Sequence, residues 1–541
     1  MIISSPPRAL PVATGAVAAC IGASTAWHYH TLGLTLSHYD ARGHLVVARR
    51  IFDSITPGWQ QIGAVWLPLP HLLNALPVQI DLLYRSGASA VAISIAAFAV
   101  AAAAIAWTVL AVTTSRAAAL AAATVFALNP NVLYLQSTPM TEPLLLATTT
   151  VAVAMLIAWS RAERSGGTGS TGLSARAVGF AFALACLTRY EAWPVTATAL
   201  AAAAWLRWRR GDSLPESVRE TARIACYPAI AIVGFAVFSR VVIGTWFVAN
   251  GFFVPENKAL GDAALAAKEI GWGVRMLSGP MLTWIGGIGI AIAAGAALVP
   301  DRAAEAVSFR SVRLRSPHAV ALRPDAAIAA SLLATAAIPW AAFYRGHPYR
   351  IRYVVPLMAA EAIGAGILAG ILPRRPAIAA AMVVAAIAGY ELRPLDRSAP
   401  MVVEAQWDRP NTPERARVTA CIGRLEPGAK IMASMGSLGH YMQEASRQGF
   451  AIRDFLHEGN GDIWLAALET PQLFADWLLI EEKAEGGDAL ARIARERPSF
   501  LTGYARDCEG AGLVLYRRVD GAEIVDPAEG PEPPVSDARP R

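Results

Sequence analysis

Charged side chains are scarce in this sequence. Only 16% of the 541 residues are charged, whereas 55% are hydrophobic and the mean hydropathy is +0.40. Lysine occurs only at Lys258, Lys268, Lys430 and Lys483. This composition excludes an ordinary soluble protein and predicts an integral membrane protein. The net charge of +6 does not indicate nucleic-acid binding, because the arginines are dispersed between apolar stretches.

Motifs for several common chemistries are also missing. The sequence has no Walker loop, nucleophile elbow, zinc-type Cys/His spacing or haem signature. The spacing of His38, His44 and His71 matches no familiar metal site, so we attribute it to chance. Cysteine is rare as well. Cys421 and Cys508 both fall in a polar C-terminal region, where they either form a disulfide, if that region is extracytoplasmic, or remain two free thiols.

Long apolar stretches are what the chain has in abundance. About eleven of them approach the roughly 20 residues that a helix needs to cross a bilayer. They lie near residues 10–28, 87–112, 117–135, 142–160, 176–189, 191–206, 222–243, 276–299, 325–343, 352–372 and 376–391. Arginine-rich loops alternate with loops that carry Asp40, Glu142, Arg189–Glu191, the stretch 244–275 and Tyr344–Tyr353. The positive-inside rule places this second set outside, and the odd number of spans leaves the C-terminus outside too.

Composition also divides the chain into domains. Residues 1–391 hold the apolar spans and form the predicted transmembrane domain. Residues 392–519 mix turn signals, short apolar runs and helical stretches, which predicts a small extracytoplasmic α/β domain. Residues 520–541, rich in Pro, Glu and Asp, are expected to be a disordered tail.

The first outer loop contains the most informative charge. About sixty residues separate the first two spans, which is long for a connector. Within it, residues 41–55 carry apolar side chains at three- and four-residue spacing, which predicts an interfacial amphipathic helix. Asp40 begins this helix, between Tyr39 and His44. A carboxylate at the membrane surface is a candidate general base, although aspartate is also a common helix N-cap.

Two further outer segments carry intramembrane charges. Glu142 stands at the start of a predicted span, where it either complements the helix dipole or has a function; the two are compatible. Arg189 and Glu191 lie at the outer ends of two adjoining spans. They either pair with each other as a structural element or serve a functional site, which is the default hypothesis for such charges.

A third outer segment combines cations with aromatic rings immediately before a span. It contains His347, Arg350, Arg352 and Tyr353. Arginine forks match phosphate oxygens, and tyrosine adds a hydrogen-bond donor at the interface. An anionic lipid head group is therefore the expected ligand, because outer loops generally carry few positive charges.

Several of these segments resemble one family. They are Tyr39-Asp40 in a long first outer loop, Asn129-Pro130 to Glu142-Pro143, Thr188-Arg189-Tyr190-Glu191, and Arg350-Ile351-Arg352-Tyr353 followed by Pro356. In their order and common side they resemble the GT-C glycosyltransferases that use polyprenyl-phosphate sugars, the group of the protein O-mannosyltransferases and lipid A aminoarabinose transferases. The resemblance covers residues 1–391, the membrane part.

The resemblance implies an inverting transfer of a sugar from a polyprenyl phosphate, with Asp40 as the general base. It implies a cell-envelope enzyme of the bacterial inner membrane, with its active site and C-terminal domain outside. The chain departs from the protein mannosyltransferases, because Asp40 is followed by Ala41 where they have an acidic pair. The acceptor therefore stays open between a glycan, a lipid and a protein.

The resemblance also assigns roles to the other outer residues. Glu142 joins Asp40 as a catalytic candidate. The donor and its lipid phosphate would be held by Arg189, His347, Arg350, Arg352 and Tyr353. The sugar or acceptor would be oriented by Tyr39, His44 and Glu191. No cofactor is required, because a lipid phosphate leaves well, and a divalent cation stays open because some relatives use one. The expected partners are the donor, its acceptor and membrane lipids, with no nucleic acid.

Two other functional classes remain to be weighed. A lipid-linked substrate transporter or flippase would show internal repeats and polar residues at mid-membrane. The notable charges here cluster instead at the outer ends of spans, which favours surface chemistry. A catalytically inactive membrane scaffold for the C-terminal domain is the third alternative.

Overall fold

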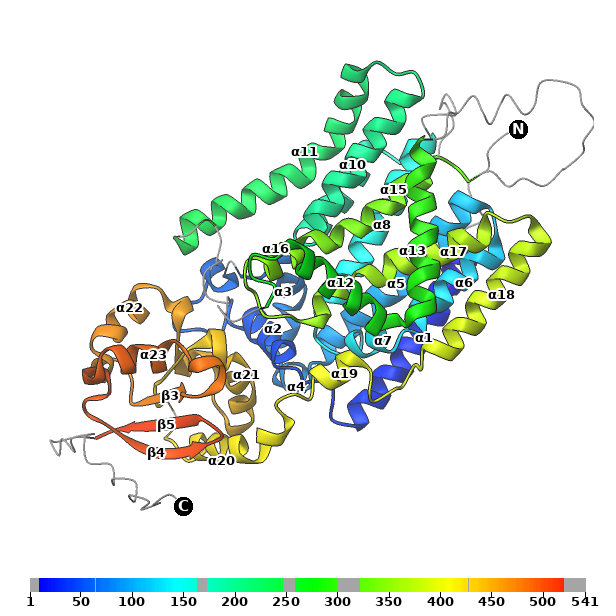
Figure 1. Cartoon of the computed structure of the whole chain (residues 1–541). Coiled ribbons are helices and arrows are strands. Elements are labelled where there is room, and N and C mark those ends of the chain that lie inside the picture. Colours follow the sequence, from blue (N-terminus) through cyan, green and yellow to red (C-terminus); the bar gives the residue numbers. More distant parts are fainter. Residues whose placement is uncertain are drawn as a thin grey trace, which may run out of the picture. The chain divides into compact units, whose positions relative to one another are not determined.

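The computed structural model describes residues 9–63, 65–162, 173–244, 246, 258–298, 322–426 and 428–519. Its contacts divide the chain into two compact units, Met1–Asp53 with Pro57–Arg409 and Ser54–Thr56 with Pro410–Arg541. The first unit is helical, and the second contains a sheet (Figure 1). The expected tail at residues 520–541 lies outside the described residues.

Helices make up the first unit. They are α1 (Ala9–Thr31), α2 (Tyr39–Arg49), α3 (Leu69–Asn74), α4 (Asp81–Ser86), α5 (Ala88–Thr113), α6 (Arg116–Ala127), α7 (Pro130–Leu135), α8 (Glu142–Ala162), α9 (Ala175–Cys186), α10 (Ala192–Arg209), α11 (Leu214–Phe238), α12 (Ala263–Ser278), α13 (Pro280–Gly295), α15 (Ala326–Ala329), α16 (Ala337–Tyr344), α17 (Leu357–Gly370), α18 (Arg374–Glu391) and α19 (Pro400–Glu404). Within the described residues, seven helical stretches are long and apolar enough to cross a membrane. The polytopic helical architecture is confirmed, whereas the count of about eleven spans is not.

One expected span, 117–135, is broken in the structure. α6 ends at Ala127 and α7 begins at Pro130. Between them the side chain of Asn129 accepts hydrogen bonds from the backbone N–H groups of Asn131 and Val132, at 3.0 and 3.3 Å. Asparagine at the N-cap followed by proline at the first helical position starts a new helix. The two short helices therefore replace the single long one that hydropathy predicts.

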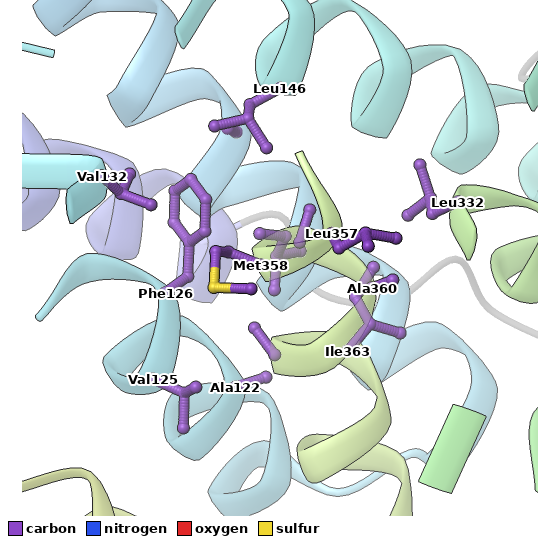
Figure 2. Close-up of a cluster of buried hydrophobic side chains, with 14 of the residues drawn as sticks. Ala122, Val125, Phe126, Val132, Leu146, Leu332, Leu357, Met358, Ala360 and Ile363 are labelled. Carbon is purple, nitrogen blue, oxygen red and sulfur yellow. The ribbon is translucent and has the colours of Figure 1, made fainter. Parts of the chain in front are cut away.

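α17 lies at the centre of the first unit. In the apolar stretch Ile351–Gly370, 89% of the residues in an 18-residue hydrophobic segment are buried. This share is higher than in the other candidate spans that the structure describes. Figure 2 shows its residues Leu357, Met358 and Ile363 among side chains from α6, α7 and α8, including Phe126. Close packing on all sides fixes the position of a helix. The turn that precedes α17, the 3₁₀ helix η7 (Ile351–Val354), is held in place with it.

The first outer loop begins with a helix, as expected, but with different limits. α2 covers Tyr39–Arg49 instead of residues 41–55. It starts early because His38, in extended conformation, caps it: the ring nitrogen Nδ1 accepts the backbone N–H of Asp40 at 3.1 Å. Leu45 and Val46 on this helix are buried. Asp40 thus lies in the first turn, with its backbone fixed by the cap.

The second unit contains a mixed five-stranded sheet. Its strands are β1 (Ile431–Ala433), β2 (Phe455–Leu456), β3 (Trp477–Glu481), β4 (Tyr504–Gly510) and β5 (Leu513–Arg518), in the order β2-β1-β3-β5-β4. β1 runs parallel to β2 and β3, and the last three strands are antiparallel. The helices α20 (Thr412–Ile422), α21 (Met435–Ala445), α22 (Asp462–Glu469) and α23 (Ala489–Glu496) complete the unit. The small C-terminal domain with a sheet is confirmed.

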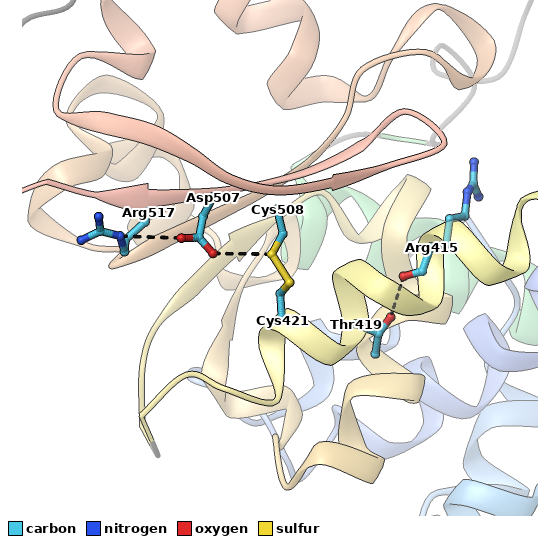
Figure 3. The surroundings of a disulfide bond; sticks show 6 residues. All are labelled: Arg415, Thr419, Cys421, Asp507, Cys508 and Arg517. Atoms are coloured by element: carbon cyan, nitrogen blue, oxygen red, sulfur yellow. Dashed lines mark hydrogen bonds and ion pairs between the residues drawn. A yellow bond between two sulfur atoms is a disulfide. The ribbon is translucent and has the colours of Figure 1, made fainter.

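Two links outside the sheet consolidate this unit. A disulfide joins Cys421 at the end of α20 to Cys508 in β4 (Figure 3). The amide of Asn460 donates to Ser54 Oγ at 3.2 Å and to Thr56 Oγ1 at 3.1 Å. Ile55 packs on the buried side chains beneath the sheet. Three residues of the first loop are therefore part of the second unit.

Glycines allow α13 and α17 to approach closely, and this generates a stability prediction. A Cβ atom on Gly289 would clash with the carbonyl oxygen of Gly364, whereas one on Gly287 would meet nothing within 4 Å. We expect Gly289→Ala to lower the free energy of unfolding by about 1–3 kcal/mol through overpacking. Gly287→Ala on the same helix is the control and should be neutral or slightly stabilising. Thermal unfolding in detergent compares the two; equal midpoints would contradict the close approach.

Candidate functional site

Asp40 is the buried carboxylate on which the site is built. Its residue is only 7% exposed, and Oδ2 forms an ion pair with Arg352 Nη1. Burial raises the pKa of the Asp40 carboxyl, but Arg352, His38 and Arg189 together outweigh it and hold that pKa below its usual value. Asp40 is therefore ionised at neutral pH.

Arg352 comes from η7 and is surrounded by aromatic rings. Its guanidinium carbon lies 5.0 Å from the ring centre of Tyr353 and 6.0 Å from that of Tyr39. Stacking on ring faces suits the weakly hydrated guanidinium group. Because η7 leads directly into the buried α17, Arg352 reaches the first loop from the rigid centre of the bundle.

A second cluster of charges surrounds Arg189, at the corner between α9 and α10. Its guanidinium donates to Glu142 Oε1 at 3.0 Å, to Thr141 Oγ1 at 2.9 Å and to Glu191 Oε1 at 2.7 Å. Glu142 is fully buried at the start of α8, and Glu191 is 3% exposed. The expected pairing between Arg189 and Glu191 is observed. The same arginine also binds Glu142. Within the described residues, Glu142 Oε2 has no hydrogen-bond partner.

Tyr353 connects the two clusters. Its ring centre lies 6.0 Å from the guanidinium carbon of Arg189 and 5.0 Å from that of Arg352. The side chain of His347 packs edge-on against the same ring at 5.3 Å. Asp40, Glu142, Glu191 and their arginines therefore form one contiguous polar site.

Arg350 is placed somewhat differently from the other candidates. Its guanidinium carbon lies 4.6 Å from the ring centre of Trp407. No sequence pattern pointed to Trp407, because it lies outside every motif and its contact with Arg350 is tertiary. Arg350 therefore contacts the segment that follows α18, which contains Trp407.

Glu404 is a carboxylate that sequence reasoning missed. Its Oε1 lies 3.5 Å from Nε2 of His38, the residue that caps α2 and stacks on Tyr39. Burial raises the pKa of Glu404, but His38, Arg352 and Arg350 together outweigh it, so that this pKa lies below its usual value. Glu404 thus holds the cap that fixes the backbone of Asp40.

His44 occupies the next turn of α2 and contacts a second histidine. Nδ1 of His44 lies 3.1 Å from Nε2 of His71, and the ring of Trp66 covers both. The sequence spacing of these histidines was attributed to chance with respect to metal binding. In the described part of the chain, no group of three or more His, Cys, Asp or Glu side chains is arranged to hold a metal ion.

The architecture is that of the GT-C glycosyltransferases. ArnT from Cupriavidus metallidurans bound to undecaprenyl phosphate superposes with a TM-score of 0.54 at 11% identity, over 94% of this chain and 98% of that one. Its apo form gives 0.51 at 11% identity, over 88% and 93%. The apo oligosaccharyltransferase of Archaeoglobus fulgidus gives 0.50 at 13% identity, over 93% and 74%.

Sequence comparison adds the enzyme class. Residues 84–251 match the family model of the dolichyl-phosphate-mannose-protein mannosyltransferases. No curated protein matches the chain in sequence. The family match and the shared fold together indicate a membrane glycosyltransferase. The expectations of the fold and of the enzyme class are confirmed.

The Asp40–Arg352 ion pair makes a pH-dependent contribution to stability. Arg352→Leu leaves a buried carboxylate unpaired, and we expect the free energy of unfolding near neutral pH to fall by about 3–5 kcal/mol. Because the pKa of Asp40 in the folded protein lies below its usual value, the contribution is complete above the unfolded-state pKa of about 4 and is lost as the pH falls through the folded pKa. Thermal unfolding of both proteins across this range should show the difference shrinking in acid.

The matched control is Arg85→Leu. Arg85 pairs with Asp81 on the exposed face of α4, at 3.1 Å. An exposed pair contributes about 1 kcal/mol or less, so this variant should stay close to the wild type. If Arg352→Leu lowers the free energy of unfolding no more than the control does, the Asp40–Arg352 pair does not behave as a buried ion pair.

Proposed function

We propose that the protein is an inverting glycosyltransferase that moves a sugar from a polyprenyl-phosphate donor to a hydroxyl acceptor, with Asp40 as the general base. The observation that supports this best is the direct ion pair between Asp40 and Arg352, next to the Arg189 cluster. A base and several guanidinium groups then border the same reacting centre. The ArnT structure with bound undecaprenyl phosphate supports a lipid phosphate of this class as the donor.

In the proposed reaction, the Asp40 carboxylate takes the proton of the acceptor hydroxyl as that oxygen attacks the anomeric carbon. The new glycosidic bond forms on the face opposite the leaving group, and the carbon–oxygen bond to the phosphate breaks. The polyprenyl phosphate leaves with the electron pair. Arg189, Arg350 and Arg352, with His347, would stabilise its charge.

Arg352 has a double role in this mechanism. While it binds Asp40, it lowers the pKa of the carboxyl and so weakens the base. A donor phosphate that binds Arg352 supplies a competing negative charge. Asp40 then loses part of its stabilising field and becomes a stronger base when the donor is in place.

The remaining candidates would hold the reactants. Tyr39 is 41% exposed and thus accessible beside Asp40. Glu142 and Glu191 orient Arg189, and the free oxygen Oε2 of Glu142 is suited to accept a sugar hydroxyl. Tyr353 would bind the lipid phosphate from between the two arginines.

The base assignment gives a direct test. We expect Asp40→Asn to lower kcat by about 10²–10⁴-fold, because the amide cannot take the acceptor proton. The assay incubates the purified protein with a panel of polyprenyl-phosphate sugars and cell-envelope extract, and follows donor consumption. Asp81→Asn removes an exposed carboxylate from the same loop and should keep full activity. Unchanged turnover in Asp40→Asn would rule out this base.

We further propose that the active site and the C-terminal domain face outward from the bacterial inner membrane. The alternation of arginine-rich loops supports this orientation. The Cys421–Cys508 disulfide supports it as well, because disulfides persist in oxidising compartments.

Thiol labelling tests the orientation. In a protein without Cys20, Cys186 and Cys226, Cys421→Ser frees the thiol of Cys508. We expect a membrane-impermeant maleimide to label it in intact spheroplasts. The control replaces the exposed Arg219 at the cytoplasmic start of α11 by cysteine, with both disulfide cysteines removed, and should react only after lysis. The reverse pattern would place the domain inside.

A further inference from the structure

A small pocket opens beside the charged site. It is bordered by α2, α3, α5 and the segment that leads into α8, and its space of about 20 Å³ fits one water-sized group. Its lining is mixed: side chains such as Leu45, Pro70 and Met140 are apolar, and others carry polar atoms. Thr141, which accepts a hydrogen bond from Arg189, also lines it and joins it to the site.

The direction of the hydrogen bonds along one edge of this pocket is fixed by a backbone carbonyl. Nδ1 of His71 lies 3.1 Å from the carbonyl oxygen of Leu67. A carbonyl only accepts, so this nitrogen carries a proton. In a neutral His71, Nε2 therefore has the lone pair and accepts from Nδ1–H of His44 at 3.1 Å. Nε2 of a neutral His44 is then left with a lone pair.

Both histidines are held in the neutral form by their surroundings. His44 is 6% exposed and His71 is 1% exposed. Burial lowers the pKa of His71 to about 3, assisted by the charge of Arg50. Burial, His71, Arg189, Arg352 and His38 together hold the pKa of His44 well below its usual value. Protonation would add a cation next to these arginines, which makes it unfavourable.

The neighbouring polar groups of the pocket supply no proton to His44. Ser94 Oγ donates to the carbonyl oxygen of Thr138 at 3.0 Å. Asn74 Nδ2 donates to the carbonyl oxygen of Pro70 at 3.3 Å. In the described part of the chain, no hydrogen bond reaches Nε2 of His44. His44 lines this small pocket, and an acceptor without a partner is suited to a group that brings its own hydrogen.

We propose that Nε2 of His44 accepts a hydrogen bond from a neutral hydroxyl of the bound carbohydrate, and that His71 is the positioning residue that sets this tautomer. The nearby arginines disfavour an ammonium group, so the class of ligand is a hydroxyl. This hydroxyl belongs either to the donor sugar or to the acceptor. The proposal rests on the glycosyl transfer proposed above and adds a specificity determinant to it.

The tautomer is tested first, without substrate. Protein labelled with ¹⁵N-histidine is studied by solid-state NMR in lipid, with His44→Gln to assign the signals. We expect His44 to carry its proton on Nδ1 and not to titrate near neutral pH. His71→Leu should move the proton to Nε2, whereas His71→Gln, whose amide both donates and accepts, should keep the original state. A proton on Nε2 in the wild type would overturn the proposal.

Kinetics with deoxy analogues test the hydroxyl. We expect His71→Leu to raise KM about 3–10-fold, the worth of one neutral hydrogen bond, while kcat changes little and His71→Gln restores the wild-type KM. An analogue that lacks the bound hydroxyl should have the same KM with the wild type and with His71→Leu. Whether this analogue is a deoxy-donor or a deoxy-acceptor identifies the substrate that carries the hydroxyl. An equal loss with every analogue would indicate a structural role only and overturn the proposal.

The two proposals fail separately. If Asp40→Asn keeps full turnover while the KM effect of His71→Leu disappears with one deoxy analogue, the base assignment is wrong and the hydroxyl site stands. If Asp40→Asn is inactive and no analogue distinguishes the His71 variants, transfer stands and the hydroxyl site is wrong.

Discussion

The need to neutralise buried guanidinium groups is the constraint on which this site depends. Arg189 and Arg352 are largely removed from water, and each such charge costs several kcal/mol unless a carboxylate compensates it. Their partners are Asp40, Glu142 and Glu191. These come from the first loop, the start of α8 and the corner before α10. Segments that are far apart in sequence therefore have to meet at one point.

The rigid part of this arrangement is α17. It is buried on all sides, and η7 delivers Arg352 and Tyr353 directly from it. The other part is the first loop, in which α2 carries Asp40 and His44. The His38 cap and its contact with Glu404 hold the start of that helix. The arginine is held by the buried helix and the carboxylate by the capped start of α2, and together they define the geometry of the site.

The composition and the order of the apolar stretches were sufficient to predict a polytopic helical unit and a small C-terminal sheet domain. They were not sufficient to predict the pairings. Arg189 and Glu191 are neighbours in sequence, so their contact could be expected, but the contact of Arg189 with Glu142 is tertiary. Glu404 carried no local signal at all, because its role depends only on the position of His38 in the fold.

Local signals were sometimes present but outweighed. Asn129-Pro130 is a helix start, and the apolar residues on both sides of it favoured one span instead of two. The pairing of His44 with His71 had no usable spacing, since a contact across 27 residues depends on how α3 folds back on α2. In both cases the structure is decided by a helix cap or by a tertiary contact. A hydropathy average over many residues does not detect either of these.

The shared guanidinium of Arg352 explains why a base with a lowered pKa fits this mechanism. A strong base exposed permanently at the membrane surface would be protonated or would activate water whenever the donor is absent. In the proposed cycle, Asp40 is instead held in its ionised, weakly basic form until a phosphate competes for Arg352. The interaction that stabilises the resting protein is then the one that donor binding weakens, so the binding of the lipid phosphate and the activation of the acceptor occur together.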